Sequence, residues 1–142
     1  MASLLENLID VLDKENTEYE KLVVLAEEKT PTIIKGDVEG LSRITEDEQV
    51  IVGRIQGMEK QRIKVLADVA NVVNRDVEDL ILTNIIQMLE PRPVEQQKLA
   101  KVYDRLKSVV HRVRAVNEQN RDLIMNALEM IEFDINMFHK RG

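Results

Sequence analysis

A packing line with steps of three or four residues runs from residue 41 to residue 72 without a phase slip. This spacing puts one side chain per turn on the same side of an α-helix, as in helices that pack in coiled-coil fashion. It predicts a long, nearly continuous helix in which polar Glu48 and Arg62 interrupt an apolar face. These two are too far apart to pair along one helix, so each is expected to meet another helix or to reach water. The line consists of Leu41, Ile44, Glu48, Ile51, Ile55, Met58, Arg62, Val65, Val69 and Val72.

The composition favours long helices throughout the chain. Its 142 residues include five Gly and three Pro, and aromatic residues make up 3%, which disfavours a strand-rich fold with many tight turns. The length fits one domain, residues 1–142. We expect an all-α fold, an elongated antiparallel helical bundle of coiled-coil type with three long helices and a short helical segment. The expected ranges are 3–35, 37–73, 76–89 and 94–140.

Local signals place the helix ends where capping residues, Gly or Pro interrupt the apolar pattern. Gly36-Asp37 combines a C-terminal stop with a new N-cap and predicts a turn near residues 35–37. Pro31, after Thr30, predicts a kink or restart of the first helix. The remaining signals are a capping box at Ser3 and Glu6, an N-cap within residues 74–76, and a helix stop at Pro91-Arg92-Pro93.

Acidic and basic residues are unevenly distributed along the chain. Residues 1–60 hold 14 acidic against 7 basic residues, whereas residues 94–142 hold 7 acidic against 9 basic ones. The two ends of the chain are therefore expected to attract each other, which fits antiparallel helices lying side by side. The net charge of −6 and the scarcity of aromatic residues argue against nucleic acid as a partner.

The residue types that carry most enzyme chemistry are missing or scattered. The chain has no Cys, and its two histidines, His111 and His139, would lie about 42 Å apart on one helix. It has no Gly-rich phosphate loop or nucleophile elbow, and its acidic runs are typical of solvated helix faces. We therefore expect no enzyme activity, no metal and no cofactor. The absence of a signal-peptide pattern and of an 18-residue uncharged segment predicts a cytoplasmic protein without membrane insertion.

The last expected helix is apolar around most of its circumference after residue 120, far more than one contact face needs. One side, Leu123, Ala127 and Met130, is expected to pack on the rest of the chain. The other side is expected to bind a partner helix, with self-association or burial in the chain's own core as alternatives. Methionines add surface that adapts to varied partners. The candidate binding residues of this segment are Ile124, Leu128, Ile131, Ile135 and Phe138, with Met125, Met130 and Met137.

Taken as a whole, the chain resembles the FlgN family of flagellar export chaperones. The residues that carry the resemblance form diffuse helical patterns without a catalytic signature. In the last helix they are Asn117-x-x-Asn120-x-x-Leu123-Ile124. In the first half they are a Leu-rich opening helix, Ala26 to Thr30, Ile33 to Asp37, Leu41, Ile44, Glu48-Gln49, Met58-Glu59 and Arg62.

The resemblance implies a role in building the bacterial flagellum. Similar proteins bind the C-terminal amphipathic helices of hook-filament junction (hook-associated) proteins in the cytoplasm and prevent premature assembly. They deliver this cargo to the flagellar type III export gate and its ATPase. The resemblance also implies that Asn117 and Asn120, one turn apart, either hydrogen-bond the partner or satisfy a position within the bundle. Two other functions stay open, a structural or scaffolding helical homodimer and a chaperone of the filament-cap protein.

Overall fold

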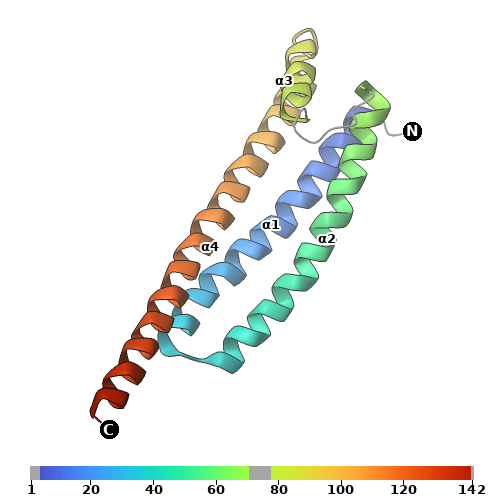
Figure 1. Cartoon of the computed structure of the whole chain (residues 1–142). Helices are drawn as coiled ribbons and strands as arrows, with labels where there is room; N and C mark the ends of the chain where they lie inside the picture. The colour runs from blue at the N-terminus through green and yellow to red at the C-terminus, as the bar shows by residue number, and fades with distance from the viewer. Residues whose placement is uncertain (1–3, 71–77, 142) are drawn as a thin grey trace.

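Four α-helices make up the part of the chain that the computed structural model describes, residues 4–70 and 78–141 (Figure 1). They are α1 (Leu4–Lys35), α2 (Val38–Ala70), α3 (Glu78–Met88) and α4 (Pro93–Arg141). These ranges contain no strand, which confirms the all-helical prediction. The expected capping box at Ser3, the N-cap within residues 74–76 and the end of the second helix at residue 73 lie outside the described residues.

The turn between α1 and α2 depends on a glycine. Gly36 has a φ of 70°, a left-handed conformation that Gly adopts without steric cost. The Gly36 amide donates to the Ile33 carbonyl and the Asp37 amide to the Thr32 carbonyl, both at 3.1 Å, which is the Schellman pattern. The Asp37 carboxylate then accepts a hydrogen bond from the Gly40 amide at 3.0 Å and caps α2. The predicted turn at residues 35–37 is confirmed.

The predicted restart of the helix at Thr30-Pro31 is wrong, because α1 continues through Pro31 to Lys35. A proline inside a helix removes one N–H hydrogen bond, and the tertiary contacts of α1 offset this loss. Thr30 does not cap a new helix. Its hydroxyl donates to Oδ1 of Asn120 at 2.6 Å and so ties the last turns of α1 to α4.

α1 lies between α2 and α4 and packs along both, whereas α2 and α4 have almost no contact with each other (Figure 1). α2 runs antiparallel to α1. Arg62, in the second half of α2, pairs with Glu15, while Glu48, in its first half, pairs with Lys29 at 2.9 Å. The expectation that Glu48 and Arg62 meet another helix is therefore confirmed.

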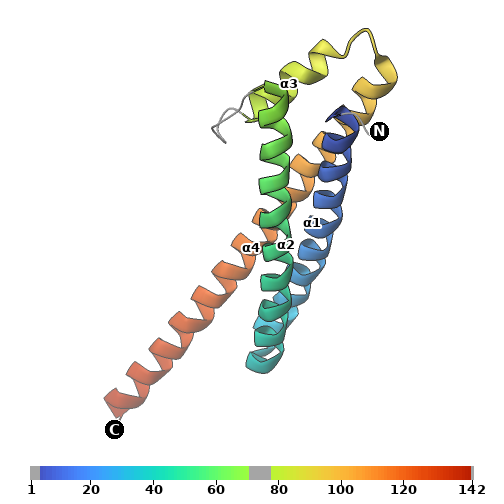
Figure 2. The same cartoon turned by 90° about the vertical axis from the view of Figure 1, so that its right-hand side faces the viewer.

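α4 runs parallel to α1, which corrects the expected antiparallel pairing of the acidic and basic ends. Arg105 pairs with Glu20, and seven residues later Arg112 pairs with Glu27 at 2.6 Å, so the two helices advance in the same direction. The reason is that α3 and the turn after it stay at one end of the bundle, where α1 also begins (Figure 2). The expected attraction nevertheless operates, because opposite charges lie at matching levels of α1 and α4.

Two clusters of buried apolar side chains fill the helix interfaces. The larger cluster, around Leu12 of α1, joins all four helices, and Leu82 of α3 covers its end at 1% exposure. The smaller cluster lies farther along α1 and includes Val113 of α4, but no later residue of that helix. The larger one contains Leu8, Leu12, Leu66, Leu82, Leu99, Val102, Tyr103 and Leu106, and the smaller one Leu22, Val23, Ile51, Ile55 and Val113.

The buried face of α1 also carries polar side chains. Glu15 is 0% exposed, and its carboxylate accepts a hydrogen bond from Arg62, which is 8% exposed. The neighbouring Asn16 donates from Nδ2 to the carbonyl of Val102 in α4 at 3.0 Å. A buried charge is costly unless it is paired, so this geometry is demanding. Two successive residues of α1 thus fix α2 and α4 at the same level of the bundle.

Arg62→Ala is expected to lower the free energy of unfolding by about 3–5 kcal/mol, because the Glu15 carboxylate stays buried without the guanidinium. The exposed Arg43 on the same helix supplies the control. Arg43→Ala is expected to change the free energy of unfolding by less than about 0.5 kcal/mol. Urea denaturation followed by far-UV circular dichroism measures both values. A loss below about 1 kcal/mol for Arg62→Ala would contradict a structural role for this pair.

Candidate protein-binding surface

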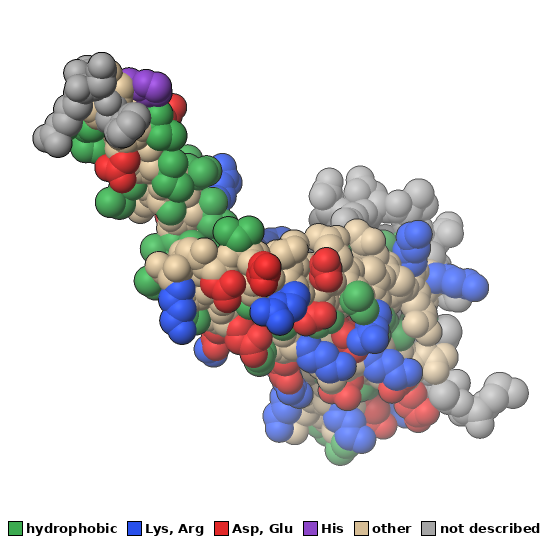
Figure 3. Space-filling view, turned by 90° about the horizontal axis from the view of Figure 1, so that it is seen from below, with side chains coloured by type: hydrophobic (Ala, Val, Ile, Leu, Met, Phe, Trp, Pro, Cys, Tyr) green, Lys and Arg blue, Asp and Glu red, His purple; other side chains and the backbone are tan. Residues whose placement is uncertain are grey.

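The end of α4 extends beyond the bundle as a single helix (Figures 1 and 2). α4 has 49 residues, against 32 in α1 and 33 in α2. Because α4 starts at the same end as α1, its last turns have no helix beside them within the described residues. We call residues 124–141 the arm. In Figure 3 hydrophobic side chains gather on this protruding part of the molecule.

Large apolar side chains are exposed on several sides of the arm. Leu128 is 60% exposed, Met130 68% and Phe133 64%. Single apolar side chains are common on protein surfaces, but a contiguous set of this kind marks an interaction site. The same surface contains Ile124, Met125, Ile131, Ile135 and Met137, all of which are exposed. The structure thus brings together the described aliphatic residues and methionines that the sequence indicated for partner binding.

Leu123, Ala127 and Met130 were expected to pack on the rest of the chain, but they do not form part of its core. Leu123 is half-buried, whereas Ala127 and Met130 are exposed. The reason is length, because α1 ends at Lys35 and does not reach the level of the arm's later turns. The side chain of Phe138 lies outside the described residues.

The two asparagines near the start of the arm have different environments. Asn120 is 2% exposed, donates from Nδ2 to the Ala26 carbonyl at 2.8 Å, and accepts from the Thr30 hydroxyl at 2.6 Å. It therefore occupies a position within the bundle. Asn117 is half-buried, and its buried Oδ1 has no hydrogen-bond partner among the described residues.

An apolar crevice lies at the base of the arm, where α4 passes the turn between α1 and α2. The end of α1 contributes Ile33, the start of α2 contributes Val38 and Leu41, and the arm contributes Ile124 and Leu128. The crevice has a volume of about 140 Å³. The first aliphatic residues of the arm therefore share a hollow with the turn, and the later ones have no such neighbour within the described chain.

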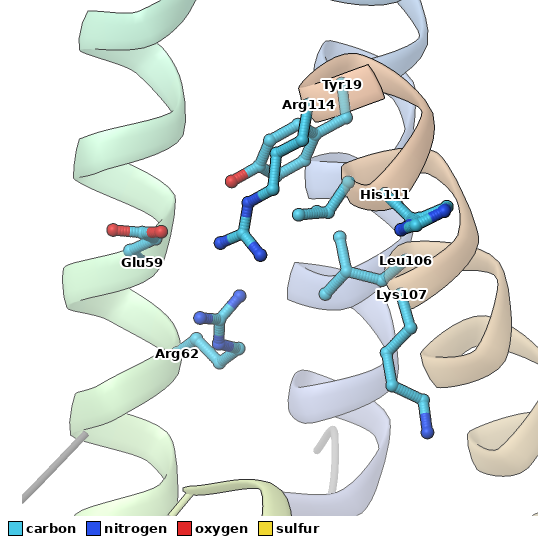
Figure 4. A pocket seen from close by; sticks show the side chains of 8 residues that line it. Tyr19, Glu59, Arg62, Leu106, Lys107, His111 and Arg114 are labelled. Carbon is cyan, nitrogen blue, oxygen red and sulfur yellow. The ribbon is translucent and has the colours of Figure 1, made fainter. Parts of the chain in front are cut away.

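A groove runs between α2 and α4, with α1 as its floor. At the middle of the bundle it widens to a hollow of about 640 Å³, lined by Tyr19 of α1, Glu59 and Arg62 of α2, and Arg114 of α4. Figure 4 shows the side chains of Arg62 and Arg114 pointing into this space from opposite walls. Lys107 and His111 lie on the α4 wall of the same hollow. Basic side chains outnumber acidic ones here.

Towards the arm, a second hollow of about 390 Å³ lies between the same three helices. Leu22 and Lys29 of α1 form part of its floor, and Val52 belongs to its α2 wall. The α4 wall consists of Asn117, Asn120, Arg121, Ile124 and Met125. We call the two hollows together the α2–α4 groove. The groove leads directly to the base of the arm.

The sequence analysis did not identify this groove. A signal was present on α4 as a second line with strict steps of three and four, next to the line that packs on α1. Only the later half of this second line is apolar, so hydrophobic periodicity marks the arm and misses the groove. The second line consists of Val110, Arg114, Asn117, Arg121, Ile124, Leu128, Ile131 and Ile135.

The described helices contain neither a membrane span nor a cluster of metal-ligating side chains. None of them is long and apolar enough to cross a membrane. Residues 4–70 and 78–141 contain no group of three or more His, Asp or Glu that could hold a metal ion. An exposed apolar arm beside an open groove, on a bundle of three long helices, defines a helical module for binding other proteins.

Comparison with known proteins agrees with this class. The model of the FlgN family, described as "FlgN protein", matches residues 1–142, so the chain belongs to the FlgN family. Its function is therefore of the flagellar export chaperone kind. The chain is also similar to the "Uncharacterized protein YvyG" of Bacillus subtilis (strain 168), with 29% identity over 119 residues that cover 84% of this chain and 71% of the relative. No solved structure matches the chain.

Asn120→Ala is expected to lower the free energy of unfolding by about 1–3 kcal/mol, because the Ala26 carbonyl and the Thr30 hydroxyl lose their partner. Asn117 provides a matched control one turn away on the same helix. Asn117→Ala is expected to change the free energy of unfolding by less than about 0.5 kcal/mol, since its acceptor makes no bond within the described chain. Urea denaturation measures both variants, and the reverse order of effects would contradict the assignment of Asn120 to the bundle.

Proposed function

We propose that this protein is a cytoplasmic chaperone of flagellar type III export that binds the C-terminal amphipathic helices of hook-filament junction proteins. The observation that carries the proposal is the exposed apolar arm. A soluble protein that leaves such a surface open has a partner for it. An amphipathic helix of the cargo would lay its apolar face along Ile124, Leu128, Ile131 and Ile135, and Phe138 continues this line in the sequence.

The energetics suit a complex that forms and later dissociates. Burying one large aliphatic side chain contributes about 1.5–3 kcal/mol, and the arm offers several such side chains. Association costs about 4–15 kcal/mol of translational and rotational freedom, which opposes this gain. The net affinity is therefore intermediate. Methionines at positions 125, 130 and 137 would let the same arm accept more than one junction protein, because their side chains adapt to different shapes.

In this proposal, residues 1–142 act as one export-chaperone domain, with the bundle as a rigid support for the arm. Covering the apolar face of the cargo helix prevents that helix from assembling with other subunits before export. The loaded chaperone then meets the export gate, and the export machinery with its ATPase supplies the step that releases the cargo. Intermediate affinity at the arm is what makes this transfer feasible.

Ile131→Asp combined with Ile135→Asp is expected to abolish binding of the C-terminal helices of junction proteins and to leave the thermal unfolding midpoint nearly unchanged. Both side chains are exposed, at 56% and 51%, so two aspartates disrupt an apolar contact without entering a core. Isothermal titration calorimetry with purified junction-protein helices from the same organism measures the binding. Circular dichroism measures the fold.

Asn126→Asp combined with Asn136→Asp is the matched control, because it adds the same two negative charges to the arm away from the aliphatic line. This variant is expected to keep at least most of the binding. Sedimentation of the unmodified protein completes the test. A tight dimer that buries the arm, together with no binding of junction-protein helices, would overturn the proposal in favour of a scaffolding homodimer. Binding only to filament-cap helices would change the cargo.

A further inference from the structure

The three long helices leave one corner of a bundle empty. In a four-helix bundle each helix packs on two neighbours and faces a third across the core. Here α1 has two neighbours, α2 and α4, while α2 and α4 have one long neighbour each and almost no contact with each other. The α2–α4 groove lies where a fourth helix would complete the arrangement. Its residues come from all three long helices, so an occupant would contact each of them.

α4 presents two adjacent packing lines. The first runs from Leu99 to Asn120 and packs on α1. The second runs from Val110 to Ile135 with steps of four and three, and contributes Val110, Arg114, Asn117, Arg121 and Ile124 to the walls of the groove. Such a line is what a helix offers to a partner helix in coiled-coil packing. One continuous helical surface therefore joins the groove to the arm.

The chemistry of this second line changes along its length. Its first half contains Arg114, Asn117 and Arg121, whereas its second half is aliphatic. Neither Arg114 nor Arg121 forms a salt bridge within the described residues. Other charges of the groove are already paired inside the molecule, since Lys29 holds Glu48 and Arg62 holds Glu15.

Arg114 and Arg121 are exposed basic side chains of α4 that line the groove. Arg114 points into the wider hollow, opposite Arg62 and Glu59 on the α2 wall (Figure 4), whereas the charge of Arg62 is already engaged by the buried Glu15 carboxylate. A guanidinium favours an anionic ligand group, because it binds a carboxylate with two parallel hydrogen bonds.

We infer that the α2–α4 groove binds the same partner helix as the arm, and that this helix is aliphatic along one half and acidic along the other. The inference rests on the proposed function, because it extends the binding site of the arm's occupant. The acidic half lies between α2 and α4 against Arg114 and Arg121, and the aliphatic half lies along the arm. The second line spans 25 steps from Val110 to Ile135, so the partner helix is about 38 Å long.

Two synthetic helical peptides test the inference, each of about 28 residues and so close to this length. Both carry the same aliphatic heptad pattern in one half, and they carry either glutamates or lysines at the same positions in the other half. Fluorescence anisotropy at low salt measures their binding to the full chain. The glutamate peptide is expected to bind about tenfold more tightly than the lysine peptide, and the preference is expected to shrink as salt increases.

Arg114→Glu combined with Arg121→Glu is expected to abolish or reverse this preference. Arg43→Glu combined with Lys64→Glu makes the same change of net charge at exposed positions of α2 that do not line the groove, and it is expected to preserve the preference. Equal binding of both peptides would overturn the inference, as would a preference that survives the substitutions at Arg114 and Arg121. Failure of both peptides to bind would overturn it as well.

The arm variant with Ile131→Asp and Ile135→Asp separates this inference from the proposed function. One outcome is that the arm variant binds neither peptide and no junction-protein helix, while substituting Arg114 and Arg121 leaves the charge preference unchanged. In that case the proposed function stands and the groove is not involved. If junction-protein helices bind the arm variant as well as the unmodified chain, the proposed function fails.

A photocrosslinker in the groove tests its occupancy directly. Because the chain has no Cys of its own, the label attaches to the single Cys of Val52→Cys, a position that lines the groove. It is expected to capture the glutamate peptide, and the same label on Arg43→Cys is not.

Discussion

Packing along α1 holds the other two long helices in place, since α2 and α4 both contact α1 and scarcely contact each other. α1 therefore has to be buried on two sides, and it carries polar as well as apolar residues on those sides. Glu15 fixes α2 through Arg62, and Asn16 fixes α4 through the Val102 carbonyl. The length of α1 also sets the length of the bundle. α4 has 17 residues more than α1 (49 against 32), so its end extends past the last turn of α1 and becomes the arm.

Much of this architecture could be predicted from residue spacing, because a helix that packs on one neighbour repeats its contacts every three or four residues. The line through Ile51 and Ile55 is buried in the structure, and the polar interruptions at Glu48 and Arg62 meet partners on α1. Gly36 predicted the turn between the first two helices correctly, because few other residues adopt its φ of 70°. Pro31 does not start a new helix as predicted, since the cost of a proline in a helix is a few kcal/mol and packing can offset it.

Spacing did not determine which helices lie side by side, or in which direction. Opposite charges attract equally well between parallel and antiparallel helices, so the pairing of Glu20 with Arg105 follows from the position of α3 and not from the charge pattern. The apolar pattern after Asn120 is also the same whether or not another helix covers it, so the pattern does not distinguish core from surface. Whether Met130 is core or surface depends on where α1 ends, which is a property of the whole bundle. Hydrophobic periodicity did not indicate the groove, because the α4 line beside it contains polar Arg114, Asn117 and Arg121.

Asn120 marks the point along α4 where contacts with the chain's own core end. Its amide bonds to Ala26 and Thr30 hold the last anchored turn, and the helix continues from there into the arm without interruption. This continuity matters for the binding that we propose. Starting a helix from a disordered chain is unfavourable, because several residues are ordered before the first hydrogen bond forms. The arm avoids that cost, since the anchored turns already provide the nucleus. A partner that meets a preformed helix loses less of its binding energy to ordering the arm, so a modest apolar surface suffices to hold it.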